Sequence, residues 1–213
     1  MPADVTTSGV ITREDLAEGR RFYSLDGKLV GASVTTVIDG ALGHDGIPKA
    51  VWEHAGRRGT AVHEAIHLYE GGVEGHTLDL DSLHEEVRPH FEGYLHFKAD
   101  YPSIKFTLSE HFVVSLKYHY GGALDAVYWD GDETLVDWKS GMELGRHASQ
   151  LAAYKNALDE MGYPNAKKLR RKCVYLTKER TYRVVEHSGE GDFYDFLAMQ
   201  RLYQTKEHHS GKY

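Results

Sequence analysis

The sequence predicts an α+β fold, in which a central mixed β-sheet carries helices on both sides. Three observations lead to this prediction. Residues 124–139 have the pattern of a β-hairpin, residues 148–158 have helical character, and strand-like segments follow at 171–177 and 181–186. A chain of 213 residues is long enough to bury a substantial core, so we expect a single domain over residues 1–213.

The composition is ordinary for a globular protein, with 41% hydrophobic and 27% charged residues. No apolar run approaches the roughly 18 residues that a membrane helix needs, and the N-terminus lacks a basic-then-apolar signal pattern. Cys173 is the sole cysteine, which excludes an internal disulfide framework and a cysteine-based metal site. We therefore expect a cytoplasmic protein with no membrane partner.

The net charge of −7 argues mildly against binding to nucleic acid, because such affinity comes largely from phosphate neutralisation. Positive charge can still be local. Basic residues gather at Arg57 and Arg58 and along residues 167–172, and a bound metal would add charge of its own. Arg57 and Arg58 are candidate substrate contacts. The run at 167–172 could follow a DNA backbone, although the solvated start of a strand explains it better.

The N-terminal part of the chain predicts a hairpin followed by a packed segment. Residues 21–30 (RFYSLDGKLV) have a hairpin pattern that turns at Asp26 and Gly27. Residues 33–38 (SVTTVI) form either a strand end or a helix start that packs on the sheet, and we assign them no catalytic role.

Two helices are then expected in succession. The first covers residues 48–55, with Pro48 suited to its first turn. The second covers residues 61–69, with Thr60 as its N-cap and an apolar stripe that places it on the core. His63 and His67 share a neighbouring face of this second helix.

A third helix is expected to run from Asp81 or Ser82 to about Tyr101. Pro89 falls near its middle, which predicts either a kink there or a start just before it. Residues 105–116 then predict a strand whose apolar face is made of Phe106, Leu108, Phe112 and Val114. Glu110 shares that face by spacing, as either a solvated edge charge or part of a metal site.

The hairpin at 124–139 is the centre of the functional prediction. Its loop, residues 130–132 (DGD), is a turn signal between two extended segments. With a loop of these three residues, Trp129 pairs with Glu133, and counting back places Asp125 opposite Asp137, with Cβ atoms about 5 Å apart. Lys139 lies two residues beyond Asp137 and so projects from the same face. A slip of one residue would separate the two aspartates.

Directly opposed like charges destabilise a sheet unless something compensates them. A divalent cation is the natural compensation, because Mg²⁺ takes carboxylate oxygens and often binds through one or two carboxylates plus substrate phosphate. Lys139 could then orient or deprotonate a water held by the metal, or stabilise charge that develops on a phosphate. Taken alone, however, Asp125, Asp137 and Lys139 fit a surface cluster of ion pairs better.

The segments after the hairpin complete the prediction. Gln150 and Tyr154 lie at i, i+4 on one face of the helix at 148–158. Two strands follow, with a turn at 178–180, and an amphipathic helix at 191–204 closes the domain.

Together, these residues resemble the RecB-like branch of the PD-(D/E)XK nuclease superfamily. The pattern of that family is a histidine early on a helix, then G-x-x-D, then (D/E)-x-K followed by small residues, then Q-x-x-x-Y. The matching residues here are His63 in GTAVHEAIH, Asp125 in GALD, Asp137 and Lys139 in DWKSG, and Gln150 and Tyr154 in QLAAY. The resemblance covers about residues 33–158, and the SVTTVI string resembles phage-type members of the family.

The resemblance implies a restriction-endonuclease-like core and a metal-dependent deoxyribonuclease, expected to be an exonuclease in DNA recombination, repair or end processing. Hydrolysis of the phosphodiester would use Mg²⁺ or Mn²⁺. Asp125, Asp137 and the backbone carbonyl of Trp138 would be metal ligands. His63 would be a further ligand or would orient the site, and Lys139 would position the nucleophile.

The resemblance also implies the remaining roles and partners. Gln150 and Tyr154 would hold either the DNA strand or the lysine, and Glu110 matches a glutamate that often sits at the metal site in the family. The partner would be DNA, with a recombination partner protein or a homo-oligomer as further partners, and the protein could be phage-encoded and act in the host cell. Branches of the family with an iron–sulfur cluster are excluded, because Cys173 is alone.

Two alternatives remain open at this point. His63-Glu64-x-x-His67 is a complete zinc-peptidase motif, in which two histidines hold zinc and the glutamate acts on the water. Its third ligand would be Glu85, Glu86 or Glu92. That alternative leaves the aspartates, Lys139, Gln150 and Tyr154 unexplained. The other alternative is a non-catalytic DNA-binding relative, which would lack one of the core charged residues; none is missing.

Overall fold

The computed structural model describes residues 9–44, 46–71 and 78–209. Within these ranges the strands form two sheets, of which the larger has the order β4-β5-β6-β7-β8. Its strands are β4 (Lys105–Ser115), β5 (Tyr120–Trp129), β6 (Glu133–Lys139), β7 (Arg170–Leu176) and β8 (Tyr182–Glu186). β6 and β7 are parallel and the other pairs are antiparallel, so the sheet is mixed, as predicted.

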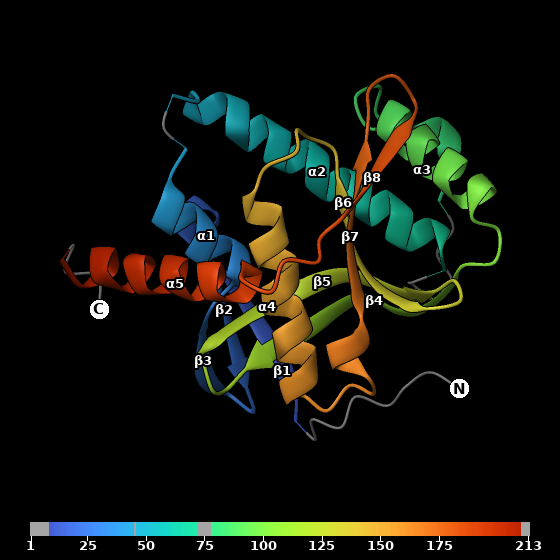
Figure 1. Cartoon of the computed structure of the whole chain (residues 1–213). Helices are drawn as coiled ribbons and strands as arrows, with labels where there is room; N and C mark the ends of the chain where they lie inside the picture. Colours follow the sequence, from blue (N-terminus) through green and yellow to red (C-terminus); the bar gives the residue numbers. More distant parts are fainter. Residues whose placement is uncertain (1–8, 45, 72–77, 210–213) are drawn as a thin grey trace.

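Helices cover both faces of this sheet (Figure 1). They are α1 (Val34–Leu42), α2 (Lys49–Tyr69), α3 (Arg88–Asp100), α4 (Arg146–Glu160) and α5 (Asp192–His209). One hydrophobic cluster joins α1, α4 and α5 to the sheet, and the other joins α2 and α3 to its opposite face. Successive side chains of β6 point to opposite faces of the sheet, since Leu135 belongs to the first cluster and Val136 to the second. The predicted α+β fold class is confirmed at this level.

The smaller sheet consists of β1 (Ile11–Asp15), β2 (Arg21–Leu25) and β3 (Lys28–Ala32). Asp26 and Gly27 both have positive φ, of 49° and 75°, which is the conformation of a two-residue hairpin turn. The predicted turn is therefore confirmed. Ser33 then caps α1, its hydroxyl accepting from the N–H of Thr36 at 2.9 Å, so the SVTTVI segment is a helix start.

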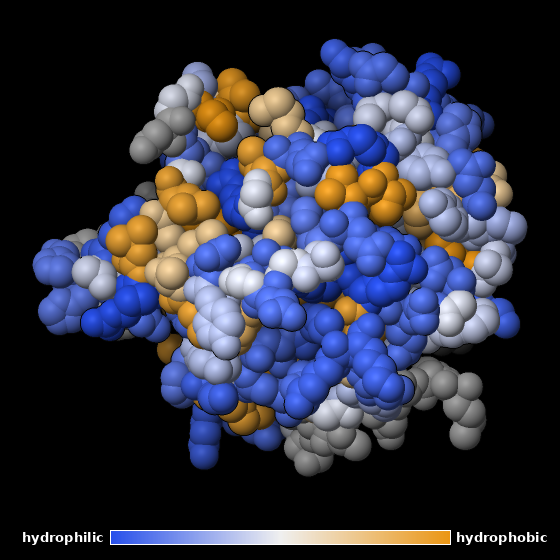
Figure 2. All heavy atoms as spheres, viewed as in Figure 1, coloured by the Kyte–Doolittle hydropathy of each residue, from blue (hydrophilic) through white to orange (hydrophobic). Residues whose placement is uncertain are grey.

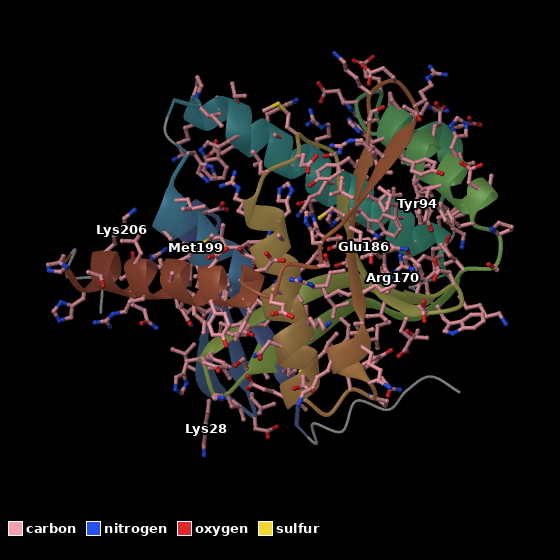
Figure 3. All side chains as sticks on the ribbon, viewed as in Figure 1. Lys28, Tyr94, Arg170, Glu186, Met199 and Lys206 are labelled. Atoms are coloured by element: carbon pink, nitrogen blue, oxygen red, sulfur yellow. The ribbon has the colours of Figure 1, made fainter. Side chains whose placement is uncertain are left out.

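Short 3-10 turns at Ala17–Gly19, Leu80–Ser82 and Ala166–Lys168 connect these elements. Side-chain contacts of Arg170 and Lys206 join strands and helices in the C-terminal part of the chain to their neighbours (Figure 3). Arg170 donates to Glu186 at 3.0 Å, which ties β8 to β7. Lys206 donates to the carbonyl oxygens of Gly40 and Ala41, which anchors α5 to the end of α1.

The bounds of three helices differ from the prediction. Residues 49–69 form one continuous helix, so Thr60 is not an N-cap; glycines at 56 and 59 weaken a helix without ending it when packing holds both sides. The helix expected from Asp81 or Ser82 instead begins at Arg88, with Pro89 in its first turn, which is the second of the two predicted outcomes. The closing helix extends to His209, beyond the expected end at 204.

The predicted apolar face of the strand at 105–116 is also wrong in part. Phe106 packs with the α2 and α3 side, whereas Leu108 and Phe112 pack with the α4 side. The register with β5 shifts between Phe106 and Leu108, and a bulge of this kind reverses the alternation of side chains.

The visible surface in Figure 2 is mostly hydrophilic, with separate hydrophobic spots among charged side chains. In the part of the chain that the structure describes, no helix is long and apolar enough to cross a membrane.

Candidate active site

The two aspartates of the hairpin lie where the sequence places them. The register runs from Trp129 opposite Glu133 to Ala126 opposite Val136, which confirms the three-residue loop. The next position on each strand holds Asp125 and Asp137. Both carboxylates are buried, with 7% and 1% exposure.

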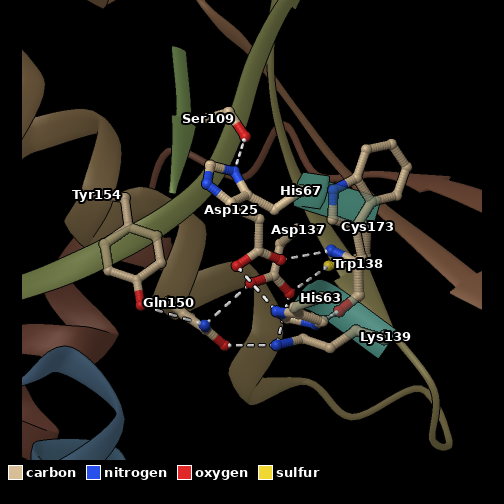
Figure 4. A network of polar contacts seen from close by, with 10 residues as sticks. All are labelled: His63, His67, Ser109, Asp125, Asp137, Trp138, Lys139, Gln150, Tyr154 and Cys173. Atoms are coloured by element: carbon tan, nitrogen blue, oxygen red, sulfur yellow. Dashed lines mark hydrogen bonds and ion pairs between the residues drawn. The ribbon is translucent and has the colours of Figure 1, made fainter. Parts of the chain in front are cut away.

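Lys139 and Gln150 surround the carboxylate of Asp137 (Figure 4). The Nζ of Lys139 lies 2.5 Å from Oδ2 of Asp137, so the two side chains share a face as predicted. Lys139 also donates to Oε1 of Gln150 at 3.0 Å, and Nε2 of Gln150 donates to Oδ1 of Asp137 at 3.0 Å. Gln150 thus bridges the acid and the lysine, and each of its polar atoms has a partner.

Tyr154 lies one helical turn after Gln150 on α4 and borders the site on the side of that helix. It is 3% exposed, and its hydroxyl is 3.4 Å from Nε2 of Gln150. Its ring lies against Gly122, where an added Cβ would come within 2.5 Å of a ring carbon. This close approach explains the glycine of the GALD segment. Of the two predicted roles, holding the DNA or holding the lysine, the geometry favours the second for Gln150, which contacts Lys139 directly, whereas the hydroxyl of Tyr154 contacts Gln150.

His63 joins the two strands of the hairpin from α2. Its Nε2 donates to the carbonyl oxygen of Trp138 at 2.6 Å, and its Nδ1 is 3.3 Å from Oδ1 of Asp125. The other carboxylate oxygen of Asp125 accepts from the Trp138 N–H at 2.7 Å. The imidazole, the carboxylate and the backbone carbonyl therefore converge on one point.

Glu110 completes this cluster through an unusual backbone conformation. Its φ is +45°, in the left-handed region that a glutamate in a strand rarely adopts. Ligand atoms of His63, Glu110 and Asp125 all lie within 4.8 Å of one another. Strained residues of this kind cost about 1–3 kcal/mol and cluster at functional sites. The predicted sharing of a face with Phe112 is wrong, because the break at Glu110 turns its carboxylate toward Asp125.

The pKa values of the cluster are shifted by burial and by the charges of its neighbours. Burial, reinforced by the charge of Asp125, raises the pKa of Glu110 to about 7. Burial also raises the pKa of Asp137 to about 6, although Lys139 opposes the rise. Burial alone would lower the pKa of His63, but the charge of Asp125 outweighs it and raises the pKa to about 9. His63 therefore holds a proton that compensates the carboxylates.

The second histidine of the H-E-x-x-H motif lines the same small cavity as this cluster but does not belong to the group with metal-ligand spacing. The Nδ1 of His67 is 2.8 Å from the hydroxyl of Ser109. Two of the three proposed third ligands are engaged elsewhere, since Glu86 contacts His54 and Glu92 contacts Arg180, and Glu85 is exposed. Among the described residues, the one group with metal-ligand spacing contains His63 without His67 or any of these glutamates.

The two arginines named from the sequence differ in environment. Arg57 is exposed, whereas Arg58 is half-buried and donates to the carbonyl oxygen of Ser140 at 3.0 Å. Arg58 therefore anchors the loop that directly follows Lys139. In the basic run at 167–172, Arg171 and Lys172 are buried in β7, where Arg171 pairs with Asp192 at 2.8 Å. This part of the run lies in a strand, as predicted, but the predicted solvation is wrong, because these two side chains are buried.

The sequence did not predict the residues of β7 that lie beside Asp137 and Lys139 in the sheet. Cys173 is the parallel partner of Asp137, and its sulfur lies 4.0 Å from Oδ2 of that aspartate. Tyr175 is the partner of Lys139, and its hydroxyl is 2.8 Å from Nδ1 of His147. Only the register of two strands separated by a helix reveals these neighbours, and nothing in the local sequence signals it.

The comparisons with known proteins identify no relative. No family model matches the chain, and no curated protein matches it. The function is therefore inferred from the geometry of the site.

The bridging position of Gln150 gives a first prediction. If the chain has the DNA-cleaving activity that the sequence resemblance implies, the Gln150→Ala protein should lose about 10- to 100-fold in kcat, because Lys139 and Asp137 each lose a partner that orients them. KM for DNA should change by less than about threefold. Steady-state kinetics on labelled DNA, with the melting temperature of each protein, checks this result.

Tyr154→Phe is the matched control, since it removes only the long contact at 3.4 Å and keeps the ring against Gly122. Its kcat should stay within about threefold of the parent. A Gln150→Ala protein that raises KM and leaves kcat unchanged would instead make Gln150 a DNA contact.

Proposed function

We propose that the chain is a metal-dependent DNA nuclease with a restriction-endonuclease-like core, most simply an exonuclease in recombination, repair or end processing. One observation carries this proposal. Lys139 lies 2.5 Å from Asp137 at the end of the hairpin, beside a cluster of His63, Glu110 and Asp125 with metal-ligand spacing. An acid, a lysine and a cation site side by side are what hydrolysis of a phosphodiester requires.

The donor set fits a divalent cation. Three carboxylates, those of Glu110, Asp125 and Asp137, face two cationic groups, Lys139 and protonated His63. A bound divalent cation would displace the His63 proton into the solvent and would compensate the carboxylates better than that single proton does. Carboxylates, a backbone carbonyl and one imidazole suit Mg²⁺ or Mn²⁺, whereas the sulfur ligands typical of softer metals are absent from these donors.

His63, Glu110, Asp125 and the carbonyl of Trp138 would hold the ion, with Asp137 beside them. When bound, Mg²⁺ or Mn²⁺ would supply Lewis-acid stabilisation of charge on the scissile phosphate. Lys139 would hold the attacking water and stabilise the charge that develops on the phosphate oxygens. Asp137 keeps that lysine protonated, because its charge raises the Lys139 pKa against the effect of burial.

DNA is the expected substrate although the chain carries a net charge of −7. The positive charge that meets the phosphates would be local: Lys139, Arg58 and the bound ion at the site, and exposed Arg57 one position earlier on α2. Affinity of this kind depends strongly on salt. A recombination partner protein or a second copy of the chain in a homo-oligomer would add further contacts to the DNA.

The charge of the cluster predicts how cation binding depends on pH. A carboxyl with a pKa of about 7 and an imidazole with a pKa of about 9 must both lose protons to the solvent when the ion binds. Affinity for Mn²⁺ should therefore fall by about tenfold or more from pH 8 to pH 6. Isothermal titration in buffers of different ionisation enthalpy measures both the affinity and the protons released.

The control for this titration is the Glu110→Gln protein, in which the pH dependence should become shallower. Mn²⁺ affinity that is independent of pH between 6 and 8 would contradict the assigned ligands.

The function itself is tested with end-labelled linear DNA, circular DNA and an unstructured protein substrate. Each is incubated with the purified chain and Mg²⁺, Mn²⁺ or Zn²⁺, with and without chelator. We expect cleavage of DNA with Mg²⁺ or Mn²⁺, abolished by chelator. Proteolysis that requires Zn²⁺ and Glu64 would favour the peptidase, and stable DNA binding without cleavage would favour a non-catalytic relative.

A further inference from the structure

A cavity separate from the candidate active site lies at the corner between α1 and α2. Its volume is about 450 Å³, within the range of about 300–1,000 Å³ that small-molecule sites occupy. α5 closes it from the side that packs on α1 (Figure 1). The side chains that matter for its chemistry are Arg20, Asp39, His44, Lys49, Trp52 and Glu207.

An aromatic pair forms one wall of this cavity. The rings of His44 and Trp52 are stacked, with centroids 4.5 Å apart and planes inclined by 14°. Both side chains are only partly buried, so the pair is not part of either hydrophobic cluster. An aromatic face that lines a cavity is suited to stacking with a nucleobase, since every base has a π-face.

Asp39 links the cavity to α4, one of the helices of the candidate active site. Its carboxylate lies 3.7 Å from His44 and 3.3 Å from the guanidinium of Arg146, the first residue of α4. α4 is also the helix that carries Gln150. Burial raises the pKa of Asp39, and the charge of Lys139 is near enough to oppose that rise. A ligand in the cavity would therefore lie on the side of the site where the proposed mechanism places the scissile phosphate, near Lys139.

The charges around the cavity are balanced, whereas the whole chain carries a net charge of −7. Arg20, Lys49 and Arg146 contribute three positive charges, and each is paired with one carboxylate, that of Glu207, Glu53 and Asp39 respectively. Lys49 is 68% exposed and lies 3.7 Å from Glu53, and an exposed pair of this kind is weak enough for a phosphate to displace the carboxylate.

We propose that this cavity binds one nucleotide, with its base against the His44–Trp52 pair and its phosphate among Arg20, Lys49 and Arg146. The inference rests on the proposed nuclease function and deepens it. The occupant would be the terminal nucleotide of a DNA strand whose next phosphate lies at Lys139. A pocket that takes one end nucleotide would make the enzyme an exonuclease.

Binding is tested first on the full chain, with deoxyadenosine 5′-monophosphate and inorganic phosphate as probes in isothermal titration. The parent should bind the nucleotide more tightly than phosphate. Trp52→Ala should weaken nucleotide binding about tenfold, whereas Trp52→Phe, which keeps an aromatic face, should stay within about threefold. Trp129→Ala is the matched control, because Trp129 is exposed at the hairpin tip.

Equal binding of phosphate and nucleotide, or nucleotide binding that Trp52→Ala leaves unchanged, would overturn the proposal. Melting temperatures of the variants show whether each is folded. If the Trp52→Ala protein does not fold, the Trp52→Phe protein still tests the proposal. The Asp137→Asn protein should bind the nucleotide like the parent, because the cavity does not include Asp137.

Cleavage distinguishes the end of a strand from a free nucleotide. On linear single-stranded DNA, Trp52→Ala should raise KM about tenfold and leave kcat within about threefold, and circular DNA of the same sequence should be a poor substrate. Equal cleavage of linear and circular DNA would overturn the end-specific site while leaving the nuclease intact. If the parent protein cuts neither linear nor circular DNA, the proposed nuclease function is wrong. Nucleotide binding that depends on Trp52 would in that case still support the cavity as a nucleotide site.

Discussion

The Lys139→Ala protein is expected to lose DNA cleavage by about 10³-fold or more while remaining folded. Lys139 is the cation closest to Asp137, and its ammonium also contacts Gln150. Its loss removes the group that orients the water and stabilises charge on the phosphate. The Asp137→Asn protein should show a loss of similar size, because the charge that positions this lysine disappears. Rates are measured with labelled DNA under single-turnover conditions.

Lys178→Ala is the matched control for this experiment. Lys178 is 85% exposed at the turn between β7 and β8, so its removal should leave the cleavage rate within about threefold. Melting temperatures separate loss of chemistry from loss of folding. Cleavage by the Lys139→Ala protein within tenfold of the parent, in a preparation free of contaminating nuclease, would exclude the role assigned to Lys139.

His63→Ala is expected to weaken Mn²⁺ binding by about 10- to 100-fold and to reduce cleavage accordingly. The imidazole links Asp125 to the carbonyl of Trp138, so its removal takes away one donor and loosens the other two. High Mn²⁺ concentrations should restore part of the activity. Manganese titration monitored by electron paramagnetic resonance, in parallel with cleavage, measures both effects.

Glu64→Gln is the neighbouring control, because Glu64 is exposed on α2 and points away from the cluster. It should leave both Mn²⁺ binding and DNA cleavage within about threefold. The opposite pattern, in which Glu64→Gln abolishes proteolysis and stoichiometric zinc is bound by His63 and His67, would replace the nuclease with the peptidase.

The hairpin was predictable from sequence because its loop length determines its register. A three-residue turn at Asp130–Asp132 permits one pairing, and that pairing brings Asp125 opposite Asp137. Helical spacing likewise placed Gln150 and Tyr154 on one face. These are local rules, which depend on residues close together in the chain.

Other features of the site depend on contacts between distant segments. The turn of Glu110 toward Asp125 comes from a positive φ in β4, which no local pattern around that glutamate signals. α2 continues through Gly59 because its apolar stripe packs on α3 and the sheet, and this tertiary packing overrides the low helix propensity of glycine. Cys173 is paired with Asp137 because β6 and β7 are parallel neighbours in the sheet, although α4 separates them in the sequence.

The most direct test of metal-dependent DNA hydrolysis uses one chelator-treated preparation of the full chain. Mn²⁺ is added in steps, and the bound ion and the single-turnover cleavage of labelled linear DNA are measured in the same samples. We predict no cleavage without the ion and a rate that rises in proportion to occupancy of one site, with no rise in the Asp125→Asn protein. Cleavage that persists in chelator, or full occupancy of the site without cleavage, would contradict the proposed function.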